Sequence, residues 1–307
     1  MAPRVLIIVL CYNRIDQTLA CLASLRRLTY DRADVLVVDN GSSDGTPQAV
    51  QAQFPAVTVI ETGANLGFAA GNNVGLRYAL DHGYAYALVL NNDTEITPDC
   101  LTTLIEAAEA DPAIGVAGPT IYYHDRPDLI WSAGGLIDWR RGCSSMRGLN
   151  QADRGQYSCA GDVDFVSGCA LLCKRSVLER VGLLDERFFM YYEETEWCVR
   201  IARAGFRIVH VPTARVTHKI PLDARADQPY VIYYMTRNRL LFLHTTGAAR
   251  TAWFHALVLQ DLRTCLSLSL RPKWRAQRYR RTAMLRAWSD FWRNRFGAAE
   301  HIPSRPL

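Results

Sequence analysis

The carboxylate of Asp93 follows an apolar run, Ala87-Leu88-Val89-Leu90, that has the pattern of a buried strand. The residues Asn91-Asn92-Asp93-Thr94 end this run, and a helix pattern with proline in its first turn begins near Thr97. Open α/β sheets bind their ligands at the carboxyl ends of strands. A carboxylate there is a hard oxygen donor that suits Mg²⁺ or Mn²⁺. Asp93 alone could equally cap a turn, but the rest of the chain favours the metal interpretation.

A second group of acids, Glu193, Glu194 and Glu196, opens a helix directly after the aromatic stretch 188–192. Acids in a first helical turn interact favourably with the helix dipole, and that role needs no chemistry. A carboxylate beside Phe189, Tyr191 and Trp197 would instead be partly desolvated, and its raised pKa would suit a general base. Position alone leaves both interpretations open.

The elements that must position these acids follow an alternating rhythm. Apolar runs at 5–10, 35–38, 57–60 and 86–90 predict strands, and the segments between them predict helices. The rhythm predicts a mostly parallel, doubly wound α/β sheet with right-handed crossovers. Polar loops at 11–14, 39–46 and 91–94 then fall at carboxyl ends of strands.

The glycine-rich segment 65–73 leads into a helix, whose first amides favour anions. Together with the polar loops, it suits a phosphorylated ligand held partly through a metal. No GKS or GKT follows the glycines, and the first strand runs into CYNR rather than GxGxxG. These absences weigh against an ATPase and a dehydrogenase.

Beyond Pro112 the pattern becomes less regular. We expect strands at 114–123 and 164–173, and a strand pair at 207–218 with Pro212 at the bend. The irregular stretch 130–164 is typical of a binding loop, in which Trp131 and Trp139 either stack on sugar rings or belong to the core. The last strand delivers His218 to an end, where a lone histidine is usually structural.

Composition indicates an ordinary globular protein, with 49% hydrophobic and 21% charged residues among 307. No apolar run reaches the length that spans a bilayer. The nine cysteines include no CxxC pair, which favours reduced thiols in a cytosolic protein and argues against a zinc site. Residues 271–295 have a net charge of +8, whereas the rest of the chain has −3.

This basic region belongs to a C-terminal helical segment. Helical spacing is visible at 228–244, 253–270 and 278–296, where Leu285, Trp288, Trp292 and Phe296 form one stripe. Basic residues interleaved with aromatic ones fit a helix lying on an anionic membrane surface. Alternatively, these helices close over the ligand site at the sheet edge or form a dimer interface. Nucleic acid is disfavoured by the enzyme-like motifs.

Taken as an ordered set, several segments resemble the inverting family 2 glycosyltransferases, most closely the bacterial rhamnosyltransferase and galactofuranosyltransferase type. The segments are CYNR, VVDNGSSDGT, NLGFAAGNNVG, LVLNNDTEI, the run from SGCALLCKR through EETEW to FRIVHVP, and the final TH. The resemblance covers residues 4–245. It implies a GT-A fold, a nucleotide-sugar donor, and a divalent metal, Mn²⁺ or Mg²⁺.

Each site residue is assigned by its match to the family's motifs. The Asp-x-Asp motif falls on Asn91-Asn92-Asp93, which leaves Asp93 as the main metal ligand beside Asn91, with His218 completing the site. Asp39 matches the family acid that accepts a hydrogen bond from the nucleobase. An acceptor at this position suits the N3–H of uracil or thymine. The other residues matching donor-binding segments are Tyr12, Asn13, Arg14, Asn65, Gly67, Asn72 and Asn92.

The family's catalytic Glu-Asp pair falls on Glu193-Glu194, so the resemblance implies that Glu194 is the general base. We expect Glu193 and Trp197 to contact the acceptor. The implied organisation is a GT-A domain at 1–225, with a nucleotide-sugar half at 1–123 and an acceptor half at 124–225. An amphipathic basic helical region then occupies 226–307.

The resulting functional hypothesis is metal-assisted, inverting transfer of a sugar, with rhamnose from dTDP-rhamnose as the first choice. The acceptor would be a saccharide or lipid-linked glycan in bacterial cell-surface polysaccharide synthesis, and the enzyme would be cytoplasmic or peripheral on the inner membrane face. Alternatives are a UDP-sugar donor carrying galactofuranose or GlcNAc, a non-catalytic nucleotide-sugar binder and a sugar-1-phosphate nucleotidyltransferase. The chain could also form a homo-oligomer.

Overall fold

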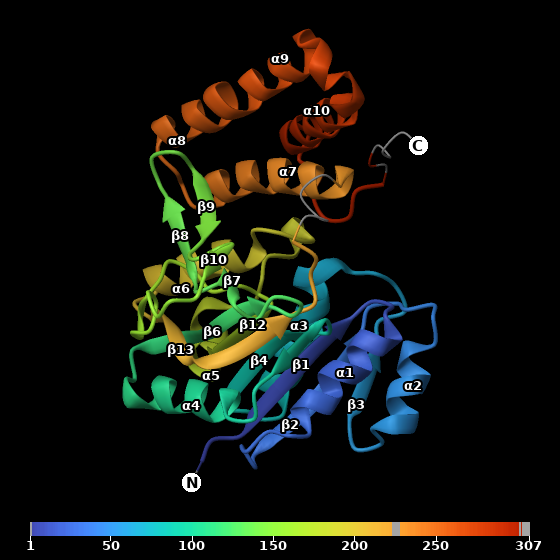
Figure 1. Cartoon of the computed structure of the whole chain (residues 1–307), viewed down its shortest axis with the longest axis vertical. Coiled ribbons are helices and arrows are strands. Elements are labelled where there is room, and N and C mark those ends of the chain that lie inside the picture. Colours follow the sequence, from blue (N-terminus) through green and yellow to red (C-terminus); the bar gives the residue numbers. More distant parts are fainter. Residues whose placement is uncertain (1, 223–227, 301, 303–307) are drawn as a thin grey trace.

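A computed structural model describes residues 2–222, 228–300 and 302 (Figure 1). One half of its central sheet contains four parallel strands, in the order β3-β2-β1-β4. These are β1 (Val5–Cys11), β2 (Ala33–Asp39), β3 (Thr58–Glu61) and β4 (Tyr86–Asn91). The chain reverses its direction of winding between β1 and β4, and such a point leaves a crevice for ligands.

Helices cover both faces of this half, as the alternation within β1 requires. Leu6 and Ile8 pack in one apolar cluster, and Val5, Ile7 and Val9 pack in the other. The helices packed in the second cluster are α1 (Ile15–Leu25), α2 (Thr46–Gln53) and α4 (Cys100–Ala110). Those in the first are α3 (Gly67–Asp81), α5 (Arg175–Val181) and α6 (Glu193–Arg203). The predicted doubly wound arrangement is confirmed.

The other half of the sheet is mixed. The antiparallel strand β12 (Ala170–Lys174) joins β4 to β6 (Ile114–Tyr123), and β6 is followed by β7 (Leu129–Ser132) and β10 (Gln151–Ala152). The long strand β13 (Arg207–His218) pairs with β6, with β5 (Thr94–Ile96) and with β11 (Gly161–Asp162).

Two of the predicted strands differ in the structure. The strand expected at 164–173 begins only at Ala170, because Ser167 turns the chain and its carbonyl accepts a hydrogen bond from the Ala170 amide at 3.2 Å. The strand pair expected at 207–218 is a single strand, which continues past Pro212 because an irregularity between Val211 and Arg215 absorbs the break.

A separate hairpin, β8 (Gly135–Asp138) and β9 (Cys143–Met146), extends from the sheet towards the C-terminal helices (Figure 1). At its turn, Trp139 stacks on Phe242 with 5.9 Å between ring centroids. The hairpin therefore joins the mixed half of the sheet to the helices above it.

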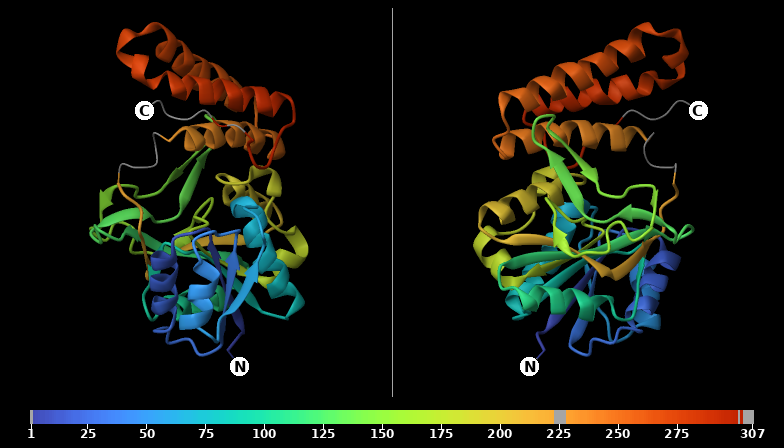
Figure 2. Two further views of the ribbon diagram at one scale, coloured as in Figure 1. Left: turned by 90° about the vertical axis from the view of Figure 1, so that its right-hand side faces the viewer. Right: turned by 60° about the vertical axis from the view of Figure 1, so that its left-hand side comes forward.

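Those helices form a layer over the hairpin, at the end of the molecule away from the N-terminus (Figure 2). They are α7 (Pro229–Thr245), α8 (Arg250–Phe254), η2 (His255–Leu262), α9 (Arg263–Leu270), η3 (Pro272–Gln277) and α10 (Arg278–Trp292). The short helix η1 (Glu186–Phe188) comes earlier in the chain, before α6. Within the described residues, none of the helices is both long and apolar enough to cross a bilayer.

The innermost helix, α7, differs from the amphipathic surface helix that the sequence predicts. Between Tyr233 and Leu243 every residue of this helix except the exposed Met235 is buried. Leu240–Leu243 share one apolar cluster with Phe188 and Tyr192 of the preceding region. The predicted boundary at 225/226 lies outside the described residues, but the core runs continuously from the sheet into α7.

Candidate active site

A cavity of ≈ 390 Å³ opens at the carboxyl ends of β1 and β4. From the segment 10–93, the lining residues are Leu10, Cys11, Tyr12, Arg14, Asn40, Asn65, Gly67, Phe68 and Asn91–Asp93. From the segment 131–218, they are Trp131, Met146, Ser167–Cys169, Met190, Tyr191, Glu193, Glu194 and His218. Most of the site residues predicted from the sequence therefore meet at one cavity.

Asp93 and His218 come together through strand register. Thr94, which begins β5, is paired with His218 at the end of β13. This register places Nε2 of His218 3.0 Å from Oδ1 of Asp93, and both side chains are buried. Trp131 packs edge-on against the imidazole, with 4.9 Å between ring centroids.

The donor atoms of this pair fit a divalent cation. Two ligands at about 2.1 Å from an octahedral metal, in adjacent positions, lie about 3 Å apart, which matches the Asp93–His218 distance. No group of three or more His, Cys, Asp or Glu side chains suited to a metal occurs in the described part of the chain. A cation held here would therefore take its remaining ligands from a bound diphosphate, water or the cavity-lining Asn91.

Glu193 and Glu194 face the same cavity from the first turn of α6. Burial raises the pKa of both carboxyl groups, and for Glu193 the neighbouring Glu194 charge raises it further. Backbone amides of Thr195 and Gly168 oppose the rise in the pKa of Glu194 by stabilising its anion. Glu193 is buried and Glu194 only partly so, and the pKa of Glu193 is raised further, so Glu194 is the first of the pair to ionise as the pH rises.

The loop before these acids has a strained backbone. Phe189, Tyr191 and Tyr192 all have positive φ, at 65°, 69° and 72°. Residues other than glycine occupy this region at a cost and usually only where the surrounding structure imposes it. Here α7 holds the loop backbone in this conformation. Asn238 on α7 donates hydrogen bonds to the carbonyls of Phe188 and Met190 at 2.7 Å each and of Tyr191 at 2.9 Å.

Arg237 reinforces this contact, donating to the Phe188 carbonyl at 3.1 Å and to the Gly297 carbonyl beyond α10 at 2.8 Å. Arg237 and Asn238 are both fully buried. Sequence analysis missed this role, because the side chains lie about 50 positions from the loop and form no motif with it. The other cavity-lining residues that it did not select include Asn40, Phe68, Ser167, Met146 and Met190.

The same loop also occupies the amino end of α3. The amide of Phe68 donates to the Phe189 carbonyl at 2.6 Å, and the amide of Gly67 donates to Oδ1 of Asn65 at 2.9 Å. The expectation that these first amides bind an anion is therefore wrong for this conformation. Gly67 is required here, since a Cβ at this position would lie 2.4 Å from the Phe189 ring.

On the donor side, Asn13 and Arg14 form a tight turn with positive φ. The Asn13 amide donates to Oγ of Ser42 at 2.7 Å, and Oδ1 of Asn13 accepts from the Ser43 amide at 2.9 Å. These bonds tie the polar loop after β1 to the polar loop after β2. Next to them Asn92 donates to Oγ1 of Thr18 at 2.9 Å.

Asp39 lies behind this turn rather than on the cavity wall. Its side chain is 1% exposed, and its oxygens accept hydrogen bonds from the Ser42 amide at 2.9 Å and from Sγ of Cys11 at 3.4 Å. Contact with a nucleobase requires the loop around Ser42 to move. The predicted base-reading role of Asp39 stays a prediction.

Two other predicted contacts are contradicted by burial. Asn72 is fully buried on α3, where its amide donates to the Phe68 carbonyl at 2.9 Å, so it does not reach the donor side of the cavity. Trp197 is fully buried under α6, and its indole N–H donates to the Gly182 carbonyl at 2.9 Å, so it does not contact an acceptor. Of the two tryptophans left open, Trp131 lines the cavity and Trp139 packs on α7.

Comparison with known proteins identifies the class. Residues 6–182 match the sequence model of the family described as Glycosyl transferase family 2. The chain is 31% identical over 274 residues to N-acetylglucosaminyl-diphospho-decaprenol L-rhamnosyltransferase of Mycobacterium tuberculosis, covering 80% of this chain and 85% of that one. It is 25% identical over 277 residues to dTDP-rhamnosyl transferase RfbF of Shigella flexneri, covering 88% and 90%.

A solved structure shows the same fold. Mannosyltransferase PcManGT from Pyrobaculum calidifontis, in complex with GDP-Man and Mn²⁺, superposes with a TM-score of 0.61 at 18% identity, covering 96% of this chain and 88% of that one. The protein is thus a glycosyltransferase with a GT-A fold. It belongs to glycosyl transferase family 2.

Proposed function

We propose that the chain catalyses inverting transfer of a sugar from a nucleoside-diphosphate donor to a glycan acceptor. The observation that carries this proposal is the placement of two kinds of acid at one cavity. Asp93, paired with His218, suits a cation that binds a diphosphate, whereas the buried Glu193-Glu194 pair lies among aromatic side chains and suits a proton acceptor.

In the proposed reaction the acceptor hydroxyl attacks the anomeric carbon as the bond to the nucleoside diphosphate breaks. Glu194 takes the hydroxyl proton, so the displacement needs no covalent intermediate with the enzyme and inverts the anomeric centre. Asp93 and His218 would hold Mn²⁺ or Mg²⁺, whose charge, when bound, neutralises the departing diphosphate. Asn91, which also lines the cavity, would supply a neutral oxygen donor in place of a second acid.

The donor we propose is dTDP-rhamnose, and the acceptor a lipid-linked glycan. Support comes from the two relatives, whose names specify rhamnosyl transfer and, for one, a diphospho-decaprenol acceptor. The cavity adds a physical reason, because Trp131, Tyr191 and Met190 present apolar surface that suits a deoxysugar with its methyl group. A UDP-linked galactofuranose or GlcNAc donor is the alternative.

The proposal is tested by thermal-shift titration with a panel of nucleotide sugars and Mn²⁺, followed by product analysis with the best ligand. We expect dTDP-rhamnose to give the largest shift and, with a polyprenyl-linked acceptor, to release dTDP and form a linkage of inverted configuration. Release of inorganic diphosphate would indicate a nucleotidyltransferase instead. Binding without any turnover would indicate a nucleotide-sugar binder.

A further inference from the structure

An apolar stripe runs along the outermost helical rod, which consists of α8, η2 and α9. Apart from the adjacent pair Val258 and Leu259, its members recur every three or four residues, and all are between 38% and 76% exposed. They are Phe254, Val258, Leu259, Leu262, Leu266 and Leu270. This spacing puts them along one side of the rod. Figures 1 and 2 show the rod at the end of the molecule furthest from the sheet.

The stripe is not the one that the sequence pattern selects on α10. There, Trp288 turns inward and donates to Asp261 at 2.9 Å, and Phe296 packs against Phe291 with 6.1 Å between ring centroids. Only Leu285 and Trp292 of that predicted stripe are exposed. Most of α10 is therefore packed against the other helices of the layer, whereas the apolar side of the rod is exposed.

The surface around the stripe is positively charged. Between residues 228 and 299 the sequence contains only two acids, Asp261 and Asp290. Both are buried and internally paired, Asp261 with Arg239 and Asp290 with Arg286. The exposed charge on this layer, over the residues the structure describes, therefore comes from Lys and Arg side chains alone.

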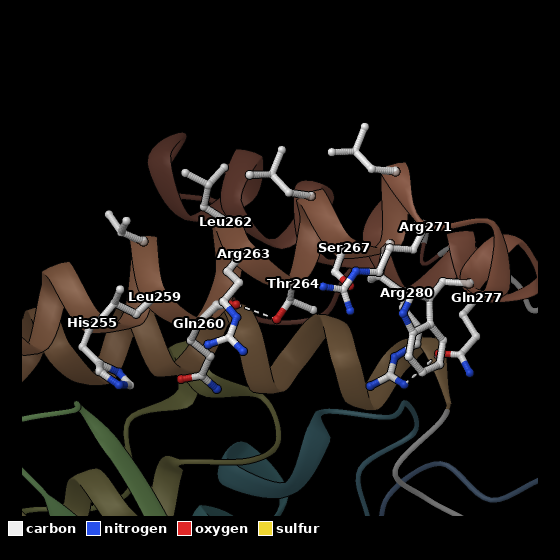
Figure 3. Close-up of a pocket in the computed structure, with 15 residues that line it drawn as sticks. His255, Leu259, Gln260, Leu262, Arg263, Thr264, Ser267, Arg271, Gln277 and Arg280 are labelled. Atoms are coloured by element: carbon white, nitrogen blue, oxygen red, sulfur yellow. Dashed lines mark hydrogen bonds between the residues drawn. The ribbon is translucent and has the colours of Figure 1, made fainter.

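On this helical layer the apolar side chains of the rod and the nearby cationic side chains point in different directions. Beside the rod lies an open hollow of ≈ 940 Å³ with both kinds of side chain on its walls. Figure 3 shows Leu262 pointing away from the body of the molecule, while Arg263 and Arg280 point back towards it. A surface that places leucines outermost and arginines one level behind matches the depth profile of a bilayer, with acyl chains beyond a phosphate layer.

We propose that this rod docks the protein on a bilayer containing anionic lipids, with the leucine stripe entering the headgroup boundary and Arg263, Arg271 and Arg280 at the phosphates. A second copy of the chain is disfavoured as the occupant, because it would bring two surfaces of like charge together. Nucleic acid would leave the leucines in water. Docking does not depend on sugar transfer. If the acceptor is lipid-linked, as proposed above, docking holds the enzyme close to it.

The test is co-flotation of the full-length protein with vesicles of phosphatidylcholine alone or with about one-third phosphatidylglycerol. We expect binding to the anionic vesicles, and weaker binding as salt screens the charges. The double variant Leu262→Gln/Leu266→Gln should bind at least about tenfold more weakly, because two buried leucines are lost. Arg263→Glu should weaken binding to the anionic vesicles by about fivefold or more.

Leu149→Gln is the matched control, since Leu149 is 44% exposed and Leu262 is 42% exposed, but it lies outside the helical layer. Circular dichroism verifies that each variant is folded. Wild-type protein that stays with neither vesicle, or a double variant that floats as well as wild type, would overturn the proposal. So would a dimer in sedimentation velocity that the double variant converts to monomer. Because flotation uses no sugar donor, its failure is distinguishable from a failure of the proposed reaction.

Discussion

Two parts of the cavity lining, the segment that carries Asp93 (the donor wall) and the segment that carries Glu194 (the acceptor wall), are held in place by different kinds of contact. Asp93 sits between two strands, and the ladder that pairs β5 with β13 brings His218 to it. Glu194 follows a loop with strained backbone, whose carbonyls are held by side chains of α7. The first wall is positioned by backbone register and the second by a buried side-chain network.

This difference implies different sensitivities. A backbone ladder distributes its support over many hydrogen bonds, so a substitution nearby removes the substituted group and little else. The loop before Glu194 depends on a few buried donors, and losing one leaves several carbonyls unsatisfied. Donor binding and acceptor activation should therefore be separable by mutation, and four predictions examine that separation in order of decreasing effect.

Replacing Glu194 with Gln should give the largest loss. Without a group to accept the hydroxyl proton, we expect kcat to fall by about 10² to 10⁴, while donor binding is unchanged. Steady-state kinetics and a dTDP titration with Mn²⁺ measure the two effects. Glu179→Gln, on the exposed surface of α5, is the control. Retained turnover would remove Glu194 from the role of base.

Replacing Asp93 with Ala should act on binding of the nucleoside diphosphate rather than on proton transfer. Loss of the anionic ligand should weaken Mn²⁺-dependent binding of the nucleoside diphosphate by at least about a hundredfold, because metal charge stabilisation amounts to several kcal/mol. The metal-free titration should change far less. Calorimetry with UDP and dTDP measures both, and an unchanged Mn²⁺-dependent affinity would contradict the assignment of Asp93.

Replacing Asn238 with Ala examines the network itself. It removes the two N–H donors that are shared among three carbonyls, which should lower stability by roughly 2 kcal/mol at about 1 kcal/mol for each donor. Relaxation of the loop should reduce kcat by about tenfold while the donor KM is retained, since a misplaced catalytic group costs rate. Met235→Ala, exposed on the same helix, is the control. A loss of stability with kcat unchanged would limit Asn238 to a structural role.

The smallest effect concerns Glu193 and stability. Burial raises its pKa above the ordinary 4.5, so the folded state retains a proton that the unfolded state has released. Stability contributed by this group therefore decreases as the pH rises above the unfolded value. Glu193→Gln should raise Tm by roughly 2 °C or more near pH 8, and the gain should vanish near pH 4. An equal gain at both pH values would mean that the charge is not responsible.

Much of the donor wall could be predicted from the sequence. The apolar runs that become β1, β2 and β4 are buried on both faces, so they read clearly, and the polar residues after them fall at one edge of a parallel sheet. Asn72 was misplaced because a helix of unknown rotation does not show which side faces a cavity. Asp39 was located at the correct strand end, but its hydrogen bonds into the Ser42 loop were not visible in any pattern.

The acceptor wall was less predictable. The sequence predicts that Trp197 contacts the acceptor, whereas its packing under α6 makes it a core side chain. In the same way, helical spacing identified three C-terminal helices but not their faces, so the apolar stripe predicted on α10 is largely internal and the exposed stripe lies on the rod.

The sequence by itself determined the parallel half of the sheet, the family, and the two acids, Asp93 and Glu194, that line one cavity. These follow from local periodicity and from short motifs, in which neighbouring residues carry the information. Only the tertiary structure decided how the loop before Glu194 is held and which helix faces outward. Those outcomes depend on buried hydrogen bonds between residues about 50 positions apart and on helix rotation, and neither leaves a periodic trace in the chain.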